Sequence, residues 1–496
     1  MTLDHRAVRG TIVVLGVAAV AVIAAVLEPN AYPSYDYAFA MASAQDVLAG
    51  RGTGYEVPVF SPVPHPLTLV EALAVVPLGD LAFPFFTAVT LLAFGLLCTS
   101  AFRIGAALAS WQVGLLAALV VFTSPVIFEL SVRTYGDVVF AALMTTALGV
   151  ELERPRRGTA VLILLALAGL VRPEAWLFSA LYWLYLAPPL GRRDRLALAA
   201  IAASGPALWL TFDALLTGNP LHSVEVTRTY TEKADATTSP HDLWIAVRSL
   251  TGWPVLLGAV AGTAIAWQRG GRGARLLLIA GVTAFLTTAA PSFLGESPVL
   301  RRYLVFPGVA LSVLFAVACL GWTGGRGGRS AWIWRVAGSG LLVLAVAALA
   351  GDRADLWSGH RHAQDRRVTF LEHLREWATA SEQRSFLTAP ACRPIRVPGY
   401  GYRPYLRFWL DVPPRAVSFH FAEVTPRDGT VLLPTAADGY QRLMLVDIGR
   451  RTRNSLLSRR DFGARFRKVA ASERWELYAG ERCRRAVSGD AEARSS

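Results

Sequence analysis

Charged residues are scarce in this chain of 496 residues. Asp, Glu, Lys and Arg make up 17% of the sequence, whereas a soluble domain carries about 25%. The deficit lies before residue 351, where long apolar runs alternate with short breaks that contain arginine. This scarcity excludes a protein that is soluble over its whole length. It predicts a membrane module over 1–350 and a smaller soluble domain over 351–496.

Lysine is almost absent. The sequence contains two lysines, Lys233 and Lys468, and the rest of the 49 Lys and Arg residues are arginines. With 36 acidic residues they give a net charge of +13, a value that is also typical of proteins that bind nucleic acid. Much of the excess, however, lies in short loops between apolar runs, where arginine sets the orientation of membrane helices. We therefore exclude nucleic acid as a partner.

Cysteine is rare, and the motifs of several enzyme classes are missing from the soluble domain. That domain has no glycine-rich phosphate loop, no Cys/His set with metal-ligand spacing and no nucleophile elbow. Two of the four cysteines lie in apolar runs, and Cys392 and Cys483 lie near the two ends of the soluble domain. If the domain is outside the cytoplasm, these two can form a disulfide, although the sequence also allows two free thiols.

Eleven apolar runs approach the length of about 20 residues that a membrane-spanning helix needs. They are 11–27, 81–102, 109–127, 135–152, 158–172, 174–189, 195–215, 251–268, 274–290, 302–322 and 331–350. The run 66–79 is too short and predicts a partly buried or re-entrant helix. Two alternatives stay open: the first run could be a cleaved signal peptide, and the runs on either side of Pro173 could form one kinked helix.

The distribution of arginine favours eleven crossings with the N-terminus in the cytoplasm. In this topology the inner loops hold roughly fifteen basic residues and the outer loops about eight. A single helix across Pro173 would turn the arginine-rich stretch 192–195 and the later basic loops outward. We therefore expect a multi-pass protein of the cell membrane whose C-terminal domain is extracytoplasmic, a compartment in which a Cys392–Cys483 disulfide is stable.

The first outer loop, 28–65, contains a predicted surface helix. Pro33 and Ser34 are typical of a helix start, and Gly50 is typical of a helix end. The segment between them is too polar to cross a membrane and apolar enough to lie on its surface. Asp36 falls in the first turn, where a carboxylate either complements the helix dipole or takes part in chemistry.

Charged side chains gather at the predicted outer ends of the membrane helices. The arginines among them break the usual inner preference for positive charge; they are Arg133, Arg172, Arg301 and Arg302. An anionic ligand in the outer leaflet would explain them, because a guanidinium group forms paired hydrogen bonds with phosphate. Alternatively, they pair with nearby carboxylates and hold the helices together. Those carboxylates are Glu129, Asp137, Glu174 and Glu296.

Several short motifs occur along the membrane module in an order typical of one superfamily. They are Asp36-Tyr37, the turn with Gly50, Gly52, Gly54 and Tyr55, the stretch Pro64-His65-Pro66-Leu67, the hairpin Leu170-Val171-Arg172-Pro173-Glu174, and Arg301-Arg302-Tyr303-Leu304. On these motifs, residues 1–350 resemble the GT-C superfamily of membrane glycosyltransferases, in particular the protein mannosyltransferase and lipid A aminoarabinose transferase-like group. The resemblance implies an all-α polytopic membrane module of about eleven transmembrane helices, followed here by a small α/β extracytoplasmic domain.

The resemblance also implies a reaction. A sugar passes, with inversion, from a polyprenyl-phosphate donor to an extracytoplasmic acceptor hydroxyl on a glycan, a lipid or a protein. Asp36 would be the base that takes the proton of the acceptor. Arg133, Arg172, Arg301 and Arg302 would bind the donor phosphate, which gains charge as it leaves. The residues expected to support the site or to face the acceptor are Glu129, Asp137, Glu174, His65 and Tyr55.

Dependence on a metal stays open in the sequence. Some members of the superfamily bind a divalent cation such as Mg or Mn at paired acidic residues of the first two outer loops, which here would be Asp36 with Glu129 or Asp137. Several families carry two adjacent acidic residues in the first loop, whereas Asp36 stands alone between two tyrosines. His65 either contacts the acceptor or, as a structural histidine, holds the loop.

The soluble domain has a predicted structure but no assigned role. An amphipathic helix is expected over 365–382. Short strands are expected at 385–388, 416–421, 430–433, 443–446 and 475–478. Four aromatic residues either bind an acceptor glycan or form the core; they are Tyr400, Tyr402, Tyr405 and Trp409. Within the membrane module, the polar segment 215–250 predicts a lid, a binding loop or a solvated loop.

Two other classes of function are compatible with a multi-pass membrane chain. A transporter or flippase of an anionic lipid-linked sugar would also need the outer arginines, but it predicts charges near the middle of the membrane and interrupted helices in repeated halves. Here the charges gather at one face. A non-catalytic membrane scaffold with a glycan-binding tail would have no use for Asp36. The sequence therefore favours a transferase.

Overall fold

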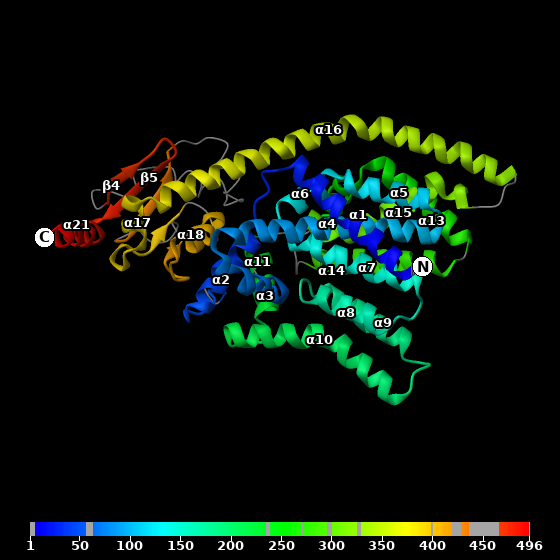
Figure 1. Ribbon diagram of the computed structural model, residues 1–496, viewed down its shortest axis with the longest axis horizontal. Coiled ribbons are helices and arrows are strands. Elements are labelled where there is room, and N and C mark those ends of the chain that lie inside the picture. The colour runs from blue at the N-terminus through cyan, green and yellow to red at the C-terminus, as the bar shows by residue number, and fades with distance from the viewer. Residues whose placement is uncertain are drawn as a thin grey trace. The chain divides into compact units, whose positions relative to one another are not determined.

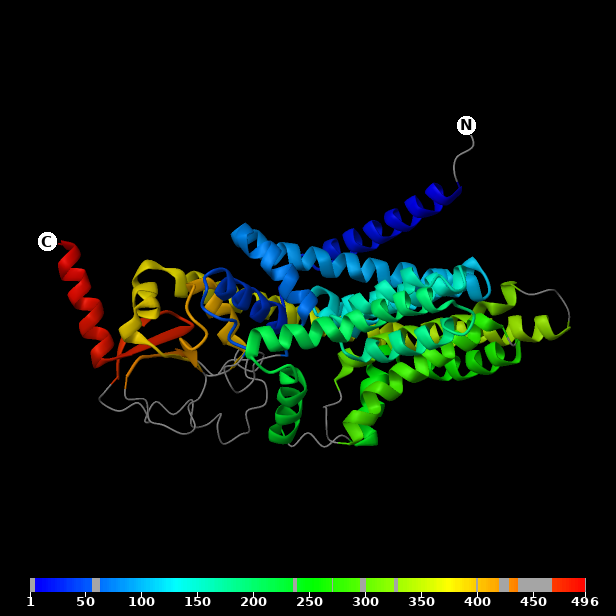
Figure 2. The ribbon, with the colours of Figure 1, turned by 90° about the horizontal axis from the view of Figure 1, so that it is seen from below.

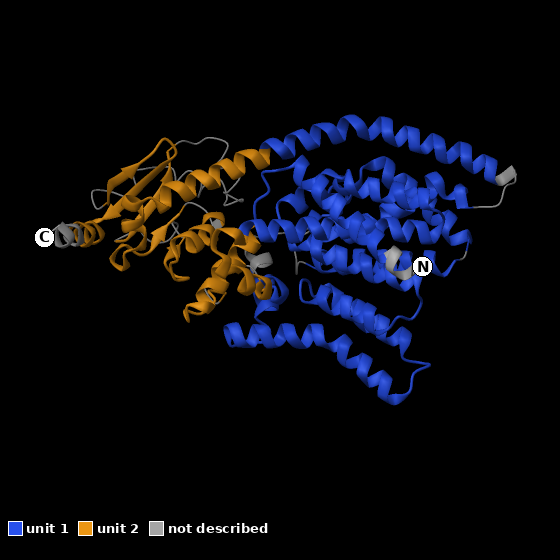
Figure 3. Cartoon of the chain, in the orientation of Figure 1, with its two compact units in different colours: residues 1–33, 65–68, 83–362 blue, residues 34–64, 69–82, 363–496 orange. Residues whose placement is uncertain are grey.

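The computed structural model describes residues 5–55, 63–234, 239–269, 271–294, 300–324, 329–397, 400–418, 428–435 and 466–495. The chain forms two compact units, each assembled from separate stretches of sequence (Figure 3). Unit 1 comprises Met1–Pro33, His65–Thr68 and Phe83–His362. Unit 2 comprises Ser34–Pro64, Leu69–Ala82 and Ala363–Ser496. Unit 2 therefore combines most of the first outer loop with the C-terminal segment.

Unit 1 is helical, and its helices gather into one bundle in two views at right angles (Figures 1 and 2). They are α1 (His5–Leu27), α4 (Ala82–Leu108), α5 (Trp111–Phe122), α6 (Pro125–Val132), α7 (Gly136–Glu153), α8 (Thr159–Gly169), α9 (Glu174–Leu186), α10 (Arg192–Thr217), α11 (His222–Ala234), α12 (Pro240–Thr251), α13 (Trp253–Arg269), α14 (Arg272–Phe293), η2 (Arg301–Leu304), α15 (Val305–Leu320), η3 (Gly321–Gly324) and the first part of α16 (Arg329–Thr379). Figure 1 shows α16 as one unbroken helix.

Helices occupy all eleven predicted spans, but length and composition support fewer crossings. Within the described residues, six helices are long and apolar enough to cross a membrane, or up to eight if two bent pairs each count as one span. The bent pairs are α5 with α6, at 63°, and α12 with α13, at 90°. The structure therefore supports a multi-pass membrane protein, and the number eleven is not confirmed.

Local sequence explains the break between α5 and α6. The hydroxyl of Ser124 accepts a hydrogen bond from the backbone N–H of Ile127 and caps α6, and Pro125 occupies the first position of that helix.

The short apolar run 66–79 is α3 (Pro66–Val75) followed by the 3-10 helix η1 (Val76–Leu81). This run forms a short helix, as predicted.

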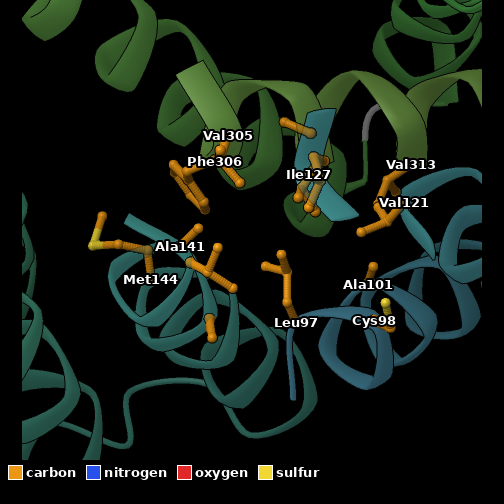
Figure 4. Close-up of a cluster of buried hydrophobic side chains, with 14 of the residues drawn as sticks. Leu97, Cys98, Ala101, Val121, Ile127, Ala141, Met144, Val305, Phe306 and Val313 are labelled. Atoms are coloured by element: carbon orange, nitrogen blue, oxygen red, sulfur yellow. The ribbon is translucent and has the colours of Figure 1, made fainter. Parts of the chain in front are cut away.

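The core of unit 1 surrounds α15. Fourteen of the sixteen residues of α15 are buried, and the helix packs against α5, α7, α13 and α14. Figure 4 shows Val305, Phe306 and Val313 of α15 facing apolar side chains of α4 to α7. The close approach of α13 depends on Gly262, because a Cβ at this position would collide with the carbonyl group of Leu314. The apolar sequence of α15 is thus explained by burial within the bundle.

Unit 2 is a mixed α/β structure. Among the residues that the structure describes, five strands form a sheet of the order β2-β1-β3-β5-β4. The strands are β1 (Ile395–Arg396), β2 (Val417–Ser418), β3 (Thr430–Pro434), β4 (Phe466–Ala471) and β5 (Trp475–Gly480). β1 is parallel to β2 and β3, whereas β5 is antiparallel to β3 and β4. The helices are α2 (Tyr35–Leu48), α3, η1, the end of α16, α17 (Ser381–Thr388), η4 (Pro390–Cys392), η5 (Tyr400–Tyr402), α18 (Arg403–Leu410) and α21 (Glu481–Ser495).

Several local predictions for unit 2 are confirmed. The first outer loop contains α2, with Ser34 at its N-cap and Gly50, at φ +69°, just after its end. The strands at 430–433 and 475–478 exist, and the expected disulfide joins Cys392 to Cys483. The helix expected over 365–382 is the last part of α16, which ends at Thr379.

Two local predictions are wrong. The strand expected at 385–388 is the end of α17, because Glu382, Gln383 and Arg384 favour a helix that runs through it. The described parts of 215–250 are not a loop but α11 and α12, and α12 begins with a capping box between Ser239 and Asp242. The strand expected at 443–446 lies outside the described residues.

Candidate functional site

Arg172 is the centre of a buried charged cluster in unit 1. It precedes Pro173, which cannot continue α8 and so ends it at the hairpin to α9. Nη1 of Arg172 donates to Oδ1 of Asp137, Nη2 donates to Oε1 of Glu174, and Nε donates to Oε2 of Glu174 at 3.2 Å. The guanidinium carbon lies 3.7 Å from the ring centroid of Tyr303, a cation–π contact. Three predicted site residues are thus brought together.

Arg302 joins the same cluster from η2. Its Nε lies 3.8 Å from Oδ2 of Asp137, so that Arg172 and Arg302 share one buried carboxylate. Its guanidinium carbon is 5.2 Å from the ring centroid of Tyr135 and 5.5 Å from that of Tyr303. Arg301, in the same turn, is exposed. We refer to Asp137, Arg172, Glu174, Arg302 and Tyr303 as the Arg172 cluster.

Arg133 and Glu129 form a second charged group, which Tyr135 links to the Arg172 cluster. Nη1 of Arg133 donates to Oε1 of Glu129 at 2.6 Å, one helical turn away, and the guanidinium carbon lies 5.4 Å from the ring centroid of Tyr135. Nδ1 of His360, in α16, lies 3.0 Å from Oε2 of Glu129. Sequence analysis missed His360, because nothing in its neighbourhood indicates a partner so far away in the chain.

His65 lies against the α8–α9 hairpin. Its Nδ1 is 2.8 Å from the carbonyl oxygen of Val171, next to Arg172, and its ring meets the ring of Trp209 edge-on at 5.9 Å. The backbone N–H of Leu67 also donates to the carbonyl oxygen of Leu170 at 3.2 Å. These contacts fit the structural alternative for His65, in which it holds the chain beside the cluster.

A small hollow of about 10 Å³ adjoins the Arg172 cluster in unit 1. Glu174 and Tyr303 belong to both. The other lining side chains are mostly apolar or aromatic and come from α7, α9, α14 and α15; they are Phe140, Phe178, Ala284, Thr287, Thr288, Phe306 and Pro307. Glu174 is the one charged side chain in this lining.

Asp36 lies in unit 2, in the first turn of α2, where it is half-buried. The ring of Phe39, one turn further, contacts Tyr35 at 6.1 Å and Tyr55 at 5.1 Å. Tyr55 is buried, and burial raises the pKa of its hydroxyl. The charge of Asp36 adds to the rise in the pKa of Tyr55. Two predicted site residues, Asp36 and Tyr55, therefore share one environment.

The sequence left metal binding open at Asp36 with Glu129 or Asp137. Among the residues that the structure describes, no three His, Cys, Asp or Glu side chains gather as a metal site requires.

In the soluble domain, Tyr402, Tyr405 and Trp409 are buried, and the ring of Tyr402 packs edge-on against that of Trp475, with their centroids 5.7 Å apart. These aromatic residues therefore belong to the core of unit 2.

Solved structures of three membrane transferase complexes share the fold of this chain. ArnT from Cupriavidus metallidurans bound to undecaprenyl phosphate has 15% identity and a TM-score of 0.53, and the match covers 94% of this chain and 97% of ArnT. The Archaeoglobus fulgidus oligosaccharyltransferase in complex with Zn and sulfate has 11% identity and a TM-score of 0.50, with coverage of 81% and 61%. The same organism's AglB in complex with an inhibitory peptide and a dolichol-phosphate has 12% identity and a TM-score of 0.50, with coverage of 82% and 64%.

No family model matches this chain, and no curated protein matches it in sequence. The likeness is one of fold. It agrees with the fold that the resemblance to the GT-C superfamily implies.

Proposed function

We propose that this chain, which has the fold of the GT-C superfamily, is an inverting glycosyltransferase. It transfers a sugar from a polyprenyl-phosphate donor to an extracytoplasmic acceptor hydroxyl on a glycan, a lipid or a protein. Support comes from structural neighbours solved in complex with undecaprenyl phosphate or a dolichol-phosphate. The observation that carries the proposal is the cluster in which Arg172 and Arg302 meet around Asp137 and Tyr303, because the phosphate of a polyprenyl-phosphate donor needs fixed cations as it leaves.

The arginines take different roles in this proposal. Arg301 is exposed and Arg302 is half-buried, so both can donate directly to the phosphate oxygens. Arg172 has its donors on Asp137 and Glu174 and lies against Tyr303, and it stabilises the leaving phosphate at close range through its charge. Arg133 adds positive charge beside Tyr135.

Asp36 is the proposed base for the acceptor hydroxyl. A carboxylate suffices for an oxocarbenium-like transition state, in which the sugar has nearly left the phosphate before the acceptor loses its proton. Tyr55 packs beside α2, and His65 holds the α8–α9 hairpin. Glu129 holds Arg133, and Asp137 and Glu174 hold Arg172. A divalent cation on Asp36 with Glu129 or Asp137 is the metal-dependent form of the proposal.

The same proposal includes a topology and a division of labour. Eleven crossings with a cytoplasmic N-terminus place the acceptor side outside the cytoplasm, in agreement with the arginine-rich inner loops. Residues 1–350 are the transferase module, and 351–496 form the extracytoplasmic domain. The disulfide between Cys392 and Cys483 supports this orientation, because disulfides persist in oxidising compartments.

A transfer assay in nanodiscs tests the proposal. Wild type is offered a panel of polyprenyl-phosphate sugars, with native membrane extract as the source of acceptor. We expect one donor to be consumed. Asp36→Asn should bind that donor and lower kcat by about 10²–10⁴-fold, the usual contribution of a general base. Asp80→Asn, at an exposed aspartate of unit 2, is the matched control and should keep wild-type turnover.

The outcomes separate the parts of the proposal. If Asp36→Asn transfers sugar as fast as wild type, the base is a different residue, and Glu129 or Asp137 becomes the next candidate. If wild type binds the lipid but transfers no sugar from any donor, the transferase proposal is wrong and a transporter or scaffold takes its place.

A further inference from the structure

Unit 2 contains a buried ion pair that joins the first outer loop to the C-terminal segment. Nη2 of Arg407, in α18, donates to Oδ2 of Asp46, in the last turn of α2. The side chain of Arg407 is 0% exposed, and that of Asp46 is 2% exposed. A charge buried this deeply is costly unless it is paired. The pair therefore requires α2 and α18 to meet in one particular register.

Other contacts hold the same two helices around this pair. Nε of Arg51 lies 3.0 Å from Oδ1 of Asp46, and Nη1 of Arg51 donates at 3.2 Å to the carbonyl oxygen of Asp411, at the end of α18. The guanidinium carbon of Arg407 lies 5.1 Å from the ring centroid of Phe39, in the middle of α2. Because these contacts lie at different heights along α2, they restrain both its rotation and its axial position.

The turn that follows α2 also packs closely on α18. Gly54 has a φ of +78°, and a Cβ at this position would lie 2.8 Å from Cβ of Pro414 and 2.9 Å from Nη2 of Arg407. Glycine is the residue that allows both this backbone conformation and this approach. The buried ring of Tyr55, next in the chain, contacts Phe39.

Asp36 lies on the helix that these contacts restrain. It precedes Asp46 by ten residues, a distance of about 15 Å along a helix axis. It precedes Phe39 by three residues, so that Asp36 and Phe39 lie on one side of α2. Rotation or sliding of α2 would therefore move the carboxylate of Asp36.

We infer that Arg407 and Asp46 are positioning residues, through which the C-terminal domain sets the place of the Asp36 carboxylate. This inference rests on the proposed function, in which Asp36 is the base. Neither residue touches reacting atoms, and a buried ion pair is a weak source of stability compared with apolar packing. What such a pair supplies is a fixed geometry, and a displacement of about 1 Å in a reacting group can cost about 10²-fold in rate. The C-terminal domain thereby becomes a part of the catalytic machinery.

Three variants of the full-length protein in nanodiscs test the inference. They are Arg407→Gln, Arg407→Lys and the double variant Asp46→Asn with Arg407→Gln. We expect Arg407→Gln to lower kcat at least about tenfold, with the KM for the donor within about twofold of wild type, because misplacement of the base affects the chemical step and leaves donor binding unchanged. Arg407→Lys keeps the charge and should restore part of kcat. The double variant leaves neither charge of the pair without its partner. Its kcat should lie below that of wild type but should fall no further than that of Arg407→Gln.

Arg375→Gln is the matched control. Arg375 lies in the part of α16 that belongs to unit 2 and pairs with Asp80 of η1. This pair also joins a C-terminal helix to an early segment of the chain, but it is exposed and does not involve α2. We expect kcat of Arg375→Gln to stay within about twofold of wild type, as is usual for an exposed ion pair.

Hydrogen exchange of the amides of 35–48 supplies a readout that does not depend on activity. Exchange should accelerate in Arg407→Gln and stay unchanged in Arg375→Gln. The inference is overturned if the folded double variant turns over at the wild-type rate, or if kcat falls only in proportion to the amount of folded protein. It is equally overturned if exchange in 35–48 does not change in Arg407→Gln. Failure of the proposed base, by contrast, would appear as wild-type turnover of Asp36→Asn and would leave the exchange result unaffected.

Discussion

The Arg172 cluster of unit 1 and the Asp46–Arg407 pair of unit 2 bury a guanidinium group in two different ways. Arg172 donates to two carboxylates and lies on an aromatic ring. Arg407 has one described carboxylate partner, Asp46, which it shares with Arg51. Within the described residues, Nε and Nη1 of Arg407 are buried without a hydrogen-bond partner. Arg172 thus has two carboxylate partners and Arg407 has one, so the two regions should respond differently to the loss of their arginine.

The two regions also differ in how far apart their partners lie in the sequence. Arg172 and Glu174 are two residues apart, and Asp137 is 35 residues from Arg172. Arg407 and Asp46 are 361 residues apart. A cluster formed by neighbouring helix ends can be read from the sequence as a motif, whereas a pair that joins the two ends of the chain exists only in the fold. Four predictions test how the two regions differ.

The largest expected effect follows from removal of Arg172. Arg172→Gln leaves Asp137 and Glu174 buried with less positive charge beside them, so we expect the free energy of unfolding in detergent to fall by about 3–5 kcal/mol. The control is Arg103→Gln, at a pair with Glu153 that is partly exposed, with an expected cost of about 0–1 kcal/mol. If both variants unfold at the same temperature, the contacts of Arg172 do not stabilise unit 1.

The disulfide provides the next largest effect, and it is confined to unit 2. Cys392 and Cys483 are 91 residues apart and are buried with Ala479. The double variant Cys392→Ser, Cys483→Ser should destabilise unit 2 by about 2–4 kcal/mol, measured by hydrogen exchange of β3 and β5. Reductant should reproduce this loss in wild type and have no effect on the double variant. Unchanged exchange in reduced wild type would contradict the prediction.

More of the fold than of the candidate site could be predicted from the sequence. Helices occupy all eleven predicted apolar runs, although the number of crossings is not confirmed. Ser34 and Gly50 predicted the two ends of α2, because residue preferences at helix ends are local. The break between α5 and α6 was missed, although Ser124 and Pro125 indicate it. The helices α11 and α12 were also missed, although the Ser239–Asp242 capping box indicates the start of α12.

The site divides in the same manner. The arginines at the predicted outer helix ends were expected to bind an anionic ligand or, alternatively, to pair with nearby carboxylates, and Arg172, Asp137, Glu174 and Arg302 do meet. His360 and Arg407 were not predicted, because an amphipathic helix carries many charged residues and none of them indicates a partner hundreds of residues away. Tertiary packing alone selects them.

Arg302 and Arg301 test the positive side of the Arg172 cluster. In the proposed function both contact the donor phosphate, but Arg302 is held by Asp137 and two aromatic rings, whereas Arg301 is exposed. Loss of a charge-assisted hydrogen bond costs about 1.5–3 kcal/mol, so Arg302→Gln should raise the donor KM about 10–100-fold. Arg301→Gln should have a smaller effect that weakens further in high salt. Equal effects of both variants at every salt concentration would show that the fixed position of Arg302 has no role in donor binding.

The smallest effect tests how tightly the turn after α2 packs on α18. Gly50 and Gly54 both have positive φ, at +69° and +78°, but a Cβ on Gly50 would meet nothing within 4 Å, whereas one on Gly54 would meet Pro414 and Arg407. Gly50→Ala therefore measures backbone strain alone, about 1–2 kcal/mol. Gly54→Ala adds the collision, and we expect a further cost of about 1 kcal/mol in the free energy of unfolding of unit 2. Because the added methyl group presses on Arg407, Gly54→Ala should also accelerate hydrogen exchange in α2, and Gly50→Ala should accelerate it less. Equal costs for the two alanines would mean that α18 yields to the added methyl group, and a helix that yields so easily could not hold Asp36 in place.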